Sequence, residues 1–360
     1  MTEHATPPAD GFSEAAVPTE LLAAGRSTAA LRADRRHWAG RRVLITGGLG
    51  FIGANLARRL SNLGAGVTLV DSLIPQYGGN AFNVADLGDK VRINISDIRD
   101  PFSLRHLVDG TEVVFNLAGQ TSHLDSMHDP LTDLDINCRS QLQLLEVCRH
   151  QNPGVRIVFA STRQVYGKPE YLPVDESHRL APTDVNGINK AAAEWYHILY
   201  NNVYNLKCSV LRLTNTYGPR MRIKDARQTF LGVWIKAAVQ GAPFEVWGGE
   251  QLRDFTYVDD AVDALLAAAM PVCDGKTLNI GGERPVSLKE TADLVVAAAD
   301  GATCYTIREF PAERKRIDIG DYYADDRAFR ALTGWQPRVP LEEGLRRTIA
   351  FYRENIAEYL

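Results

Sequence analysis

The spacing of hydrophobic positions changes abruptly where residue 43 begins a short apolar run. Residues 43–45 are Val-Leu-Ile and lead into a glycine-rich turn, as the end of a buried parallel strand does. Apolar residues then recur at helical spacing over 52–63, glycines follow at 64–66, and a second apolar run occupies 67–70. The pattern predicts a strand, a tight turn, a helix and a second strand.

The same alternation continues along the next part of the chain. Further strands are expected at 91–95, 113–117, 157–160 and 209–213. Helices are expected after Asp100-Pro101, over 131–149 and over 184–204. Strands separated by helices favour a parallel sheet with right-handed crossovers. We therefore expect an α/β fold with a Rossmann-like, doubly wound parallel sheet.

After Tyr217 the alternation becomes less regular. Helices are expected at 228–240, 258–270, 287–300 and 341–352, with a short apolar stretch at 244–247. Ser287 and Glu290 have the spacing of a capping box. We expect a Rossmann domain over 39–217 and a smaller C-terminal α/β substrate lobe over 218–360, with about 255–282 returning to the Rossmann domain. Residues 1–38 are expected to form a partly ordered extension with a helix around 19–36.

Composition narrows the classes of function. The chain has 360 residues, 45% hydrophobic and 23% charged, with a formal net charge of −4 that disfavours a nucleic-acid partner. Its five cysteines lack C-x-x-C spacing, so neither a disulfide framework nor a metal site is expected. The N-terminus lacks the pattern of a secretory signal, and no apolar run reaches the length of a membrane span. We expect a cytoplasmic protein without a membrane partner.

The turn at Thr46–Gly53 has the pattern of a dinucleotide site. It follows the first strand and opens the first helix, whose free N–H groups favour phosphates. Asp71 ends the second strand, 18 residues past Gly53, where a carboxylate accepts hydrogen bonds from an adenosine ribose. The same carboxylate would repel a 2′-phosphate, so NAD is expected rather than NADP.

Several motifs in one order resemble a known family. Thr46–Gly53 has the TGxxGxxG form of the extended short-chain dehydrogenase/reductase superfamily. The other matching segments are Asp97-Ile98, Asn116–Gln120, Ser126, Ser161–Gly167, Arg212–Pro219, Arg253–Asp260, Gly334–Pro337 and Glu342–Leu345. Residues 41–354 as a whole resemble its NAD-dependent nucleotide-sugar epimerases and dehydratases.

The resemblance implies which residues hold the cofactor. They are Gly47, Gly50, Phe51, Ile52, Gly53, Asp71, Ser72, Asp97, Ile98, Leu117, Ala118, Gly119 and Lys190. It also implies oxidation at C4 of a nucleoside-diphosphate sugar by NAD, followed by epimerisation, decarboxylation or dehydration. A homodimer through the helices at 131–149 and 184–204 is implied as well.

The sequence departs from the family at the acid/base position. The family has a tyrosine four residues before a lysine, and here Asn186 precedes Lys190. An amide has no protonation change near neutral pH and cannot be the general base. A second departure places Arg163 and Gln164 where related dehydratases have Asp and Glu. Neither side chain supplies the acid for loss of a hydroxyl, so a common dehydratase is disfavoured.

Three routes remain for removing the proton of the sugar hydroxyl. His123 or Tyr166 can replace the missing base, Lys190 can act through Thr162 or a water, or the protein does not oxidise a sugar at all. We expect Thr162 to contact the sugar hydroxyl and Asn186 to orient the sugar or a water. A lone histidine such as His123 also has a structural interpretation.

Substrate contacts are expected from Gln120, Arg163, Gln164, Asn215, Arg253 and Arg316. Arg253 and one arginine of 314–316 are expected to clamp the diphosphate. Arg163 either binds a carboxylate or phosphate of the substrate or pairs with a local acid, and the sequence leaves both open. The first hypothesis is an NAD-dependent nucleotide-sugar epimerase. The alternatives are a decarboxylase or dehydratase of the same family, and a non-catalytic NAD(H)-binding sensor or scaffold.

Overall fold

The computed structural model describes residues 35–227, 229–310 and 318–360. Most of the expected N-terminal extension, including nearly all of its expected helix, lies outside these residues. The first described element is the short helix α3 (Arg35–Trp38), whose Trp38 is fully buried and lies 6.0 Å, ring centroid to ring centroid, from Phe115. The N-terminal edge of the fold is therefore anchored by one aromatic side chain.

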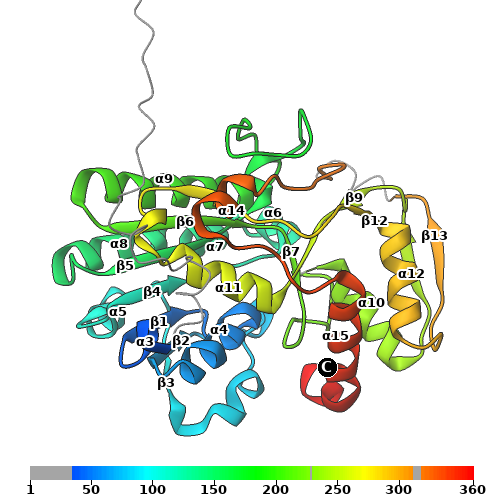
Figure 1. The fold of residues 1–360 in the computed structure, drawn as a ribbon, viewed down its shortest axis with the longest axis horizontal. Helices are drawn as coiled ribbons and strands as arrows, with labels where there is room; N and C mark the ends of the chain where they lie inside the picture. The colour runs from blue at the N-terminus through cyan, green and yellow to red at the C-terminus, as the bar shows by residue number, and fades with distance from the viewer. Residues whose placement is uncertain (1–34, 228, 311–317) are drawn as a thin grey trace, which may run out of the picture.

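Seven parallel strands form the central sheet, in the order β11-β6-β5-β4-β1-β2-β3 (Figure 1). The strands are β1 (Arg42–Thr46), β2 (Gly66–Asp71), β3 (Val91–Ile95), β4 (Val113–Asn116), β5 (Arg156–Thr162), β6 (Lys207–Leu213) and β11 (Thr277–Asn279). The chain reverses its direction of strand addition between β1 and β4, and such a switch point places a crevice at the carboxyl ends of these strands. The expected Rossmann-like sheet is confirmed.

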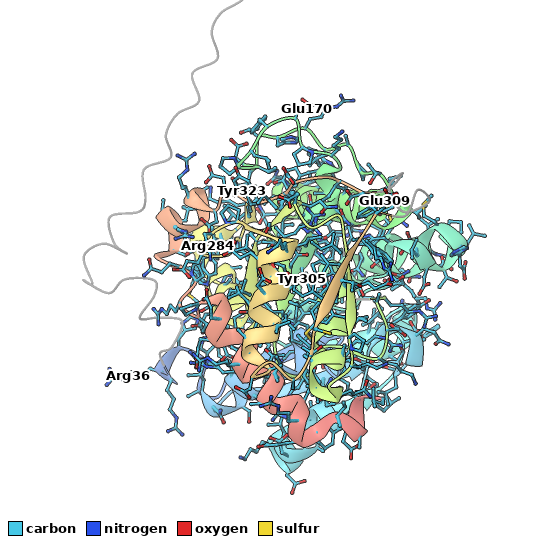
Figure 2. All side chains as sticks on the ribbon, turned by 90° about the vertical axis from the view of Figure 1, so that its right-hand side faces the viewer. Arg36, Glu170, Arg284, Tyr305, Glu309 and Tyr323 are labelled. Atoms are coloured by element: carbon cyan, nitrogen blue, oxygen red, sulfur yellow. The ribbon has the colours of Figure 1, made fainter. Side chains whose placement is uncertain are left out.

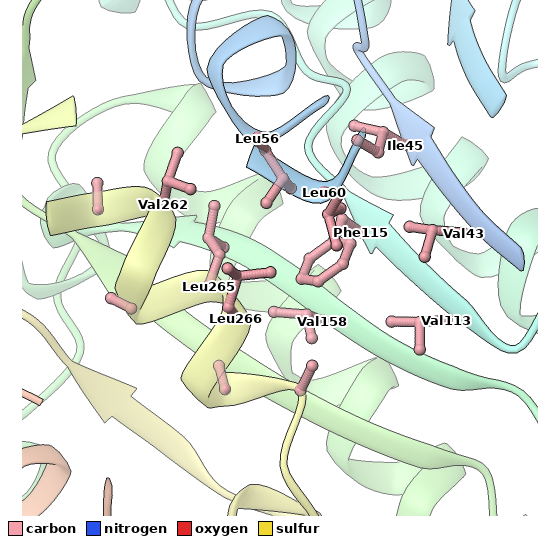
Figure 3. Close-up of a cluster of buried hydrophobic side chains, with 14 of the residues drawn as sticks. Val43, Ile45, Leu56, Leu60, Val113, Phe115, Val158, Val262, Leu265 and Leu266 are labelled. Atoms are coloured by element: carbon pink, nitrogen blue, oxygen red, sulfur yellow. The ribbon is translucent and has the colours of Figure 1, made fainter. Parts of the chain in front are cut away.

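Alternate side chains of each strand enter the cores on opposite faces of the sheet. Val43 and Ile45 of β1 pack under α4 (Phe51–Asn62) and α11 (Val258–Ala268), whereas Leu44 joins the core on the other face. Figure 3 shows the first of these cores, where Leu56, Leu60, Val262, Leu265 and Leu266 of the two helices cover Val43, Ile45, Val113, Phe115 and Val158 of the strands. Burial on both faces explains the near-continuous apolar runs in the sequence.

Three helices cover the opposite face of the sheet. They are α5 (Pro101–Val108), α8 (Ser140–Gln151) and α9 (Val185–Tyr204). The Asp100 side chain caps α5 by accepting from the Phe102 and Ser103 N–H groups, as the Asp-Pro pair predicts. The described residues contain no helix long and apolar enough to cross a bilayer.

The prediction of one helix over 131–149 is wrong in its interior. The segment consists of α7 (Pro130–Leu134), a π-helical turn η3 (Asp135–Arg139) and α8. The π turn adds a residue to the helical repeat, and such turns are frequent at functional sites. Here the Gln141 side chain donates to the Ile136 carbonyl oxygen, and Asn137 is directed into the protein interior.

A second hydrophobic core lies around α10 (Phe230–Gln240), α12 (Leu288–Ala298) and α15 (Leu341–Asn355), and it includes Phe51 of α4. The capping box is confirmed in part, because the Ser287 hydroxyl accepts from the Glu290 N–H at 3.0 Å. Figure 2 views this part of the fold from outside, with Tyr305 of β13 (Tyr305–Arg308) beside α12, where its hydroxyl donates to Asp293.

The remaining elements are short. The strands are β7 (Asn215–Tyr217), β8 (Phe244–Trp247), β9 (Leu252–Arg253), β10 (Phe255–Tyr257), β12 (Val286–Ser287) and β13 (Tyr305–Arg308), which pair as β7 with β10, β8 with β13, and β9 with β12. The helices are α6 (His123–His128), α14 (Arg327–Thr333), η1 (Pro75–Tyr77), η2 (Ala81–Lys90), η4 (Arg163–Tyr166), η5 (Pro271–Cys273) and η6 (Ile356–Tyr359).

Candidate active site

A cavity lies at the carboxyl ends of β1, β2, β4, β5 and β6. Every residue expected to contact the cofactor lines it: Gly47, Gly50, Phe51, Ile52, Gly53, Asp71, Ser72, Asp97, Ile98, Leu117, Ala118, Gly119 and Lys190. It is also lined by Gln120, His123, Thr162, Arg163, Gln164, Asn186 and Asn215. The structure thus brings most of the predicted site residues together at the switch point of the sheet.

The glycine-rich turn holds the start of α4 close to β1 and β4. Gly47 has a φ of +67°, which favours glycine, and a Cβ at Gly53 would lie 2.2 Å from the Gly47 carbonyl oxygen. No side chain caps α4 at Gly50, so the N–H groups of its first turn are available to a phosphate. This turn fits the pyrophosphate of a dinucleotide.

Asp71 connects the end of β2 to the same turn. One carboxylate oxygen accepts from the Leu49 N–H at 3.1 Å and the other from the Leu73 N–H at 2.9 Å. Burial raises the pKa of Asp71, and these two backbone hydrogen bonds oppose that shift. The carboxylate faces the cavity from a fixed position, where it fits an adenosine ribose.

A buried carboxylate, that of Asp133, contacts residues that line the cavity. Asp133 of α7 is 1% exposed and accepts from the side-chain amides of Asn137 at 3.0 Å, Asn186 at 3.2 Å and Asn189 at 2.8 Å. The backbone carbonyl oxygen of Gln120 accepts from Asn137 and Asn186 as well, at 2.9 and 2.7 Å. Buried polar groups are satisfied here by a connected network.

This network fixes the orientation of Asn186. Both neighbours of its amide are acceptors, so the nitrogen faces them and the carbonyl oxygen Oδ1 faces elsewhere. The same reasoning orients Asn137, whose Oδ1 is buried without a hydrogen-bond partner in the described part of the chain. Asn186 therefore presents an acceptor to the cavity at the position where the family has a phenol.

Lys190 lies next to this network, one helical turn after Asn186. Its Nζ donates to the Ala160 carbonyl oxygen at 3.1 Å and lies 4.7 Å from the centroid of the Phe159 ring. Burial lowers the pKa of Lys190 to about 8, and the nearby carboxylate of Asp133 opposes that shift. A Cβ at Gly119 would lie 3.1 Å from Nζ, so the glycine allows the lysine to reach the cofactor-lining backbone.

His123 forms a pair with Asp184 at the wall of the cavity. Its Nδ1 lies 2.9 Å from Asp184 Oδ2, a close approach that does not have hydrogen-bond geometry in this structure, and its Nε2 lies 2.9 Å from Gln164 Nε2. Burial alone would raise the pKa of Asp184, but His123 and the Gly187 N–H lower it overall, so this carboxylate is ionised at neutral pH. A carboxylate at Nδ1 favours the tautomer with its hydrogen on Nδ1 and a basic Nε2.

The structure contradicts the catalytic role expected for Tyr166. The side chain is fully buried outside the cavity, its hydroxyl donates to Asn279 at 2.7 Å, and it accepts from Arg212 at 2.7 Å. Burial raises the pKa of Tyr166 to about 12. Tyr166 therefore connects η4 (Arg163–Tyr166) to β11 and is not placed to take a proton from a substrate.

Arg253, which is expected at the diphosphate, is not among the residues that line the cavity. Arg253 donates to the carbonyl oxygens of Leu252 and Gly320 and lies 3.3 Å from Asp318. These partners occupy the Arg253 guanidinium. The structure therefore does not support the expected direct contact between Arg253 and a diphosphate. Arg316 lies outside the described residues.

Two acidic residues of the site were not predicted from the sequence. The sequence predicts Asp184 only as the start of a helix, and in the structure it is both the cap of α9 and the neighbour of His123. No motif of the sequence includes Asp133. A signal for it exists, because Asp133 and Asn137 are four apart, Asn186 and Asn189 are three apart, and both pairs interrupt apolar helix faces.

Comparison with known proteins agrees with this geometry. Residues 43–281 match the NAD dependent epimerase/dehydratase family. The chain is 34% identical over 323 residues to a UDP-glucose 4-epimerase of Mycolicibacterium smegmatis, covering 87% of this chain and 99% of that protein. It is 31% identical to UDP-glucuronic acid decarboxylase 1 of Xenopus tropicalis over 327 residues, covering 88% and 73%.

Among solved structures, the fold is similar to that of a Thermotoga maritima UDP-glucose 4-epimerase determined with UDP-glucose. The TM-score is 0.80 at 30% identity, with 88% of this chain and 99% of that chain covered. The matched segment contains the glycine-rich turn, Asp71 and Lys190, and NAD is the cofactor of the matched family. The chain belongs to the NAD dependent epimerase/dehydratase family.

Proposed function

We propose that the protein is an NAD-dependent epimerase of a nucleoside-diphosphate sugar and that it acts at C4. The observation that carries this proposal is the His123–Asp184 pair, which places a basic nitrogen at the cavity although the family tyrosine is absent. Relatives that epimerise UDP-glucose match nearly the full length of the chain, which supports UDP-sugars as the first substrates to test.

The position of each residue determines its role in this reaction. The glycine-rich turn and Asp71 hold the two ends of the dinucleotide, and NAD, when bound, accepts and returns the hydride. Thr162 contacts the sugar hydroxyl, and His123 Nε2 takes its proton as the C4 ketone forms. The hydroxyl takes the place that the Gln164 amide has at Nε2 in the free protein. Return of the proton from His123 completes either stereochemical outcome.

Asn186 and Lys190 orient ligands in this scheme. The Asn186 Oδ1 accepts a hydrogen bond from the sugar or a water, because its nitrogen is already bound to Gln120 and Asp133. Lys190 donates to the nicotinamide ribose from its buried position beside Gly119. Its lowered pKa makes it the second candidate for the base, acting through Thr162 or a water.

The alternatives predict different products. A decarboxylase would release CO₂ from a uronic acid, and a dehydratase would release water. A non-catalytic NAD(H)-binding sensor would bind the sugar without any change in it, and Asn186 is the residue that supports this alternative. Epimerisation is preferred to dehydration because neither Arg163 nor Gln164 supplies the acid for loss of a hydroxyl, and the product distinguishes epimerisation from decarboxylation.

The test is to mix the NAD-loaded protein with UDP-glucose and with UDP-glucuronic acid. We expect transient reduction of the bound nicotinamide, seen by its absorbance, and a C4 epimer as product, identified by NMR. Release of CO₂ or water instead of an epimer would replace the proposal by one of the lyase alternatives. Saturable binding without reduction or product would favour the sensor.

A further inference from the structure

The guanidinium of Arg163 is held on two sides and free on a third. Arg163 is the first residue of η4 and lines the cavity directly after Thr162. Its Cζ lies 5.3 Å from the centroid of the buried Tyr322 ring, and its Nη2 donates to Asn215 Oδ1 at 3.2 Å. Its Nη1 is buried and has no hydrogen-bond partner among the described residues. A buried donor of this kind needs a partner in the functional state.

No carboxylate of the described residues lies within ion-pair distance of Arg163, although three are close enough to affect its pKa: Asp184, Asp254 and Asp318. Asp184 contacts His123, and Asp318 contacts Arg253. Asp254 accepts through Oδ2 from the Ala324 and Gly282 N–H groups and leaves Oδ1 without a partner.

Burial lowers the pKa of Arg163, because the cation has lost water without gaining a paired anion. The local ion pair that the sequence left open is therefore not formed in this structure. The alternative, an anion supplied by the substrate, remains.

The neighbours of Arg163 favour the sugar ring as the position of the missing anion. Gln164 follows it, contacts His123 Nε2 and keeps its own Oε1 buried without a partner. Thr162 precedes it. A group bound to the free edge of Arg163 therefore lies next to the residues proposed to act on the sugar hydroxyl. In a nucleotide sugar the diphosphate is attached through the anomeric oxygen at C1, across the ring from C4.

We propose that Arg163 binds the carboxylate of a uronic acid carried on UDP, so that the natural substrate is an acidic nucleotide sugar. The inference rests on the proposed function for the orientation of the sugar. Arginine presents two parallel donors to a planar carboxylate, and the Tyr322 ring and Asn215 hold that fork in place before the ligand binds. A hydroxymethyl group at the same carbon would leave the cation buried and unpaired, which provides selectivity.

The experiment measures binding, without turnover, to the NADH-loaded protein by calorimetry. UDP-glucuronic acid and UDP-glucose are compared because they differ only in a carboxylate against a hydroxymethyl group. We expect wild type to bind UDP-glucuronic acid at least about tenfold more tightly than UDP-glucose. Arg163→Gln should lose about 10- to 150-fold in affinity for UDP-glucuronic acid, with little change in its affinity for UDP-glucose. Arg163→Lys, which keeps the charge and loses the fork, should lie between them.

Arg308→Gln is the matched control, because Arg308 is exposed on β13 and pairs with Glu245 away from the cavity. NADH affinity and melting temperature establish that each variant is folded. Equal losses of affinity for both sugars in Arg163→Gln would place Arg163 at the diphosphate and overturn the proposal. A wild type that binds neither sugar, or that prefers UDP-glucose, would also overturn it. Selective binding of the uronic acid without an epimeric product would keep this inference and reject the proposed reaction.

Discussion

His123 Nδ1 lies 2.9 Å from Asp184 Oδ2, and the same Asp184 caps the helix that carries Asn186 and Lys190. Asp184 Oδ1 accepts from the Gly187 N–H at 2.7 Å while Oδ2 faces the imidazole. One buried carboxylate thus caps the helix and lies next to the imidazole of the histidine. The base proposed here is therefore tied to the helix turn at which the family has its tyrosine.

Restoring the family residue at position 186 is expected to reduce activity. Tyrosine lacks the amide donors that now bind Gln120 and Asp133, and it is larger than the 2% exposed Asn186 allows. We expect Asn186→Tyr to lower kcat and the melting temperature relative to wild type. Asn186→Ala is the control for loss of the amide without added bulk. An increase in kcat in the tyrosine variant would show that a phenol can still act here.

The cofactor preference should depend on Asp71. Its carboxylate faces the cavity from two backbone hydrogen bonds and would repel a 2′-phosphate. We expect wild type to bind NADH more than about tenfold tighter than NADPH, a difference of about 1.4 kcal/mol or more. Asp71→Ala should narrow that ratio in a fluorescence titration. Equal affinities in wild type would contradict the assignment of Asp71 to the ribose.

Stability should depend on pH through Lys190. Burial lowers its pKa from 10.5 to about 8, so between these values the unfolded chain binds a proton that the folded chain has released. The free energy of unfolding contributed by this group therefore rises as pH increases from about 8 to 10.5, and below about 8 it no longer changes because both states bind the proton. Between these two pH values, the free energy of unfolding of wild type should increase by roughly 1–3 kcal/mol more than that of Lys190→Met, measured by urea unfolding without cofactor. Parallel curves for the two proteins would contradict the lowered pKa.

The outer faces of α7 and α9 are expected to form a dimer interface. Leu131 is 72% exposed, Trp195 66% and Val203 59%, although all three are large and apolar. A two-fold contact would cover them in both copies. We expect a homodimer in light scattering at micromolar concentration and a monomer for Trp195→Glu. Phe102→Glu, at an exposed apolar residue of α5, is the control that should leave the dimer intact. A monomeric wild type would contradict the expectation.

The sequence predicts the fold and the cofactor crevice well, because both depend on local patterns. Apolar runs of strands between amphipathic helices determine the sheet, and the turn at Thr46–Gly53 requires small residues at fixed spacing. Long-range partners are not predictable in this way. Tyr166 has the motif position of an active-site residue, but its hydroxyl is bound to Asn279 more than a hundred residues away. The pairing of His123 with Asp184 likewise depends on tertiary packing.

The central claim is that His123 is the acid/base of an NAD-dependent epimerisation. The most direct measurement is the rate of C4 inversion, followed by NMR on UDP-glucose and UDP-glucuronic acid, in wild type and His123→Ala, with Tyr166→Phe as the control. The account predicts inversion by wild type, a loss of about 10²–10⁴-fold in His123→Ala, and a much smaller change in Tyr166→Phe despite its lower stability. A His123→Ala protein that keeps its rate within about tenfold of wild type would contradict the account and leave Lys190 as the base.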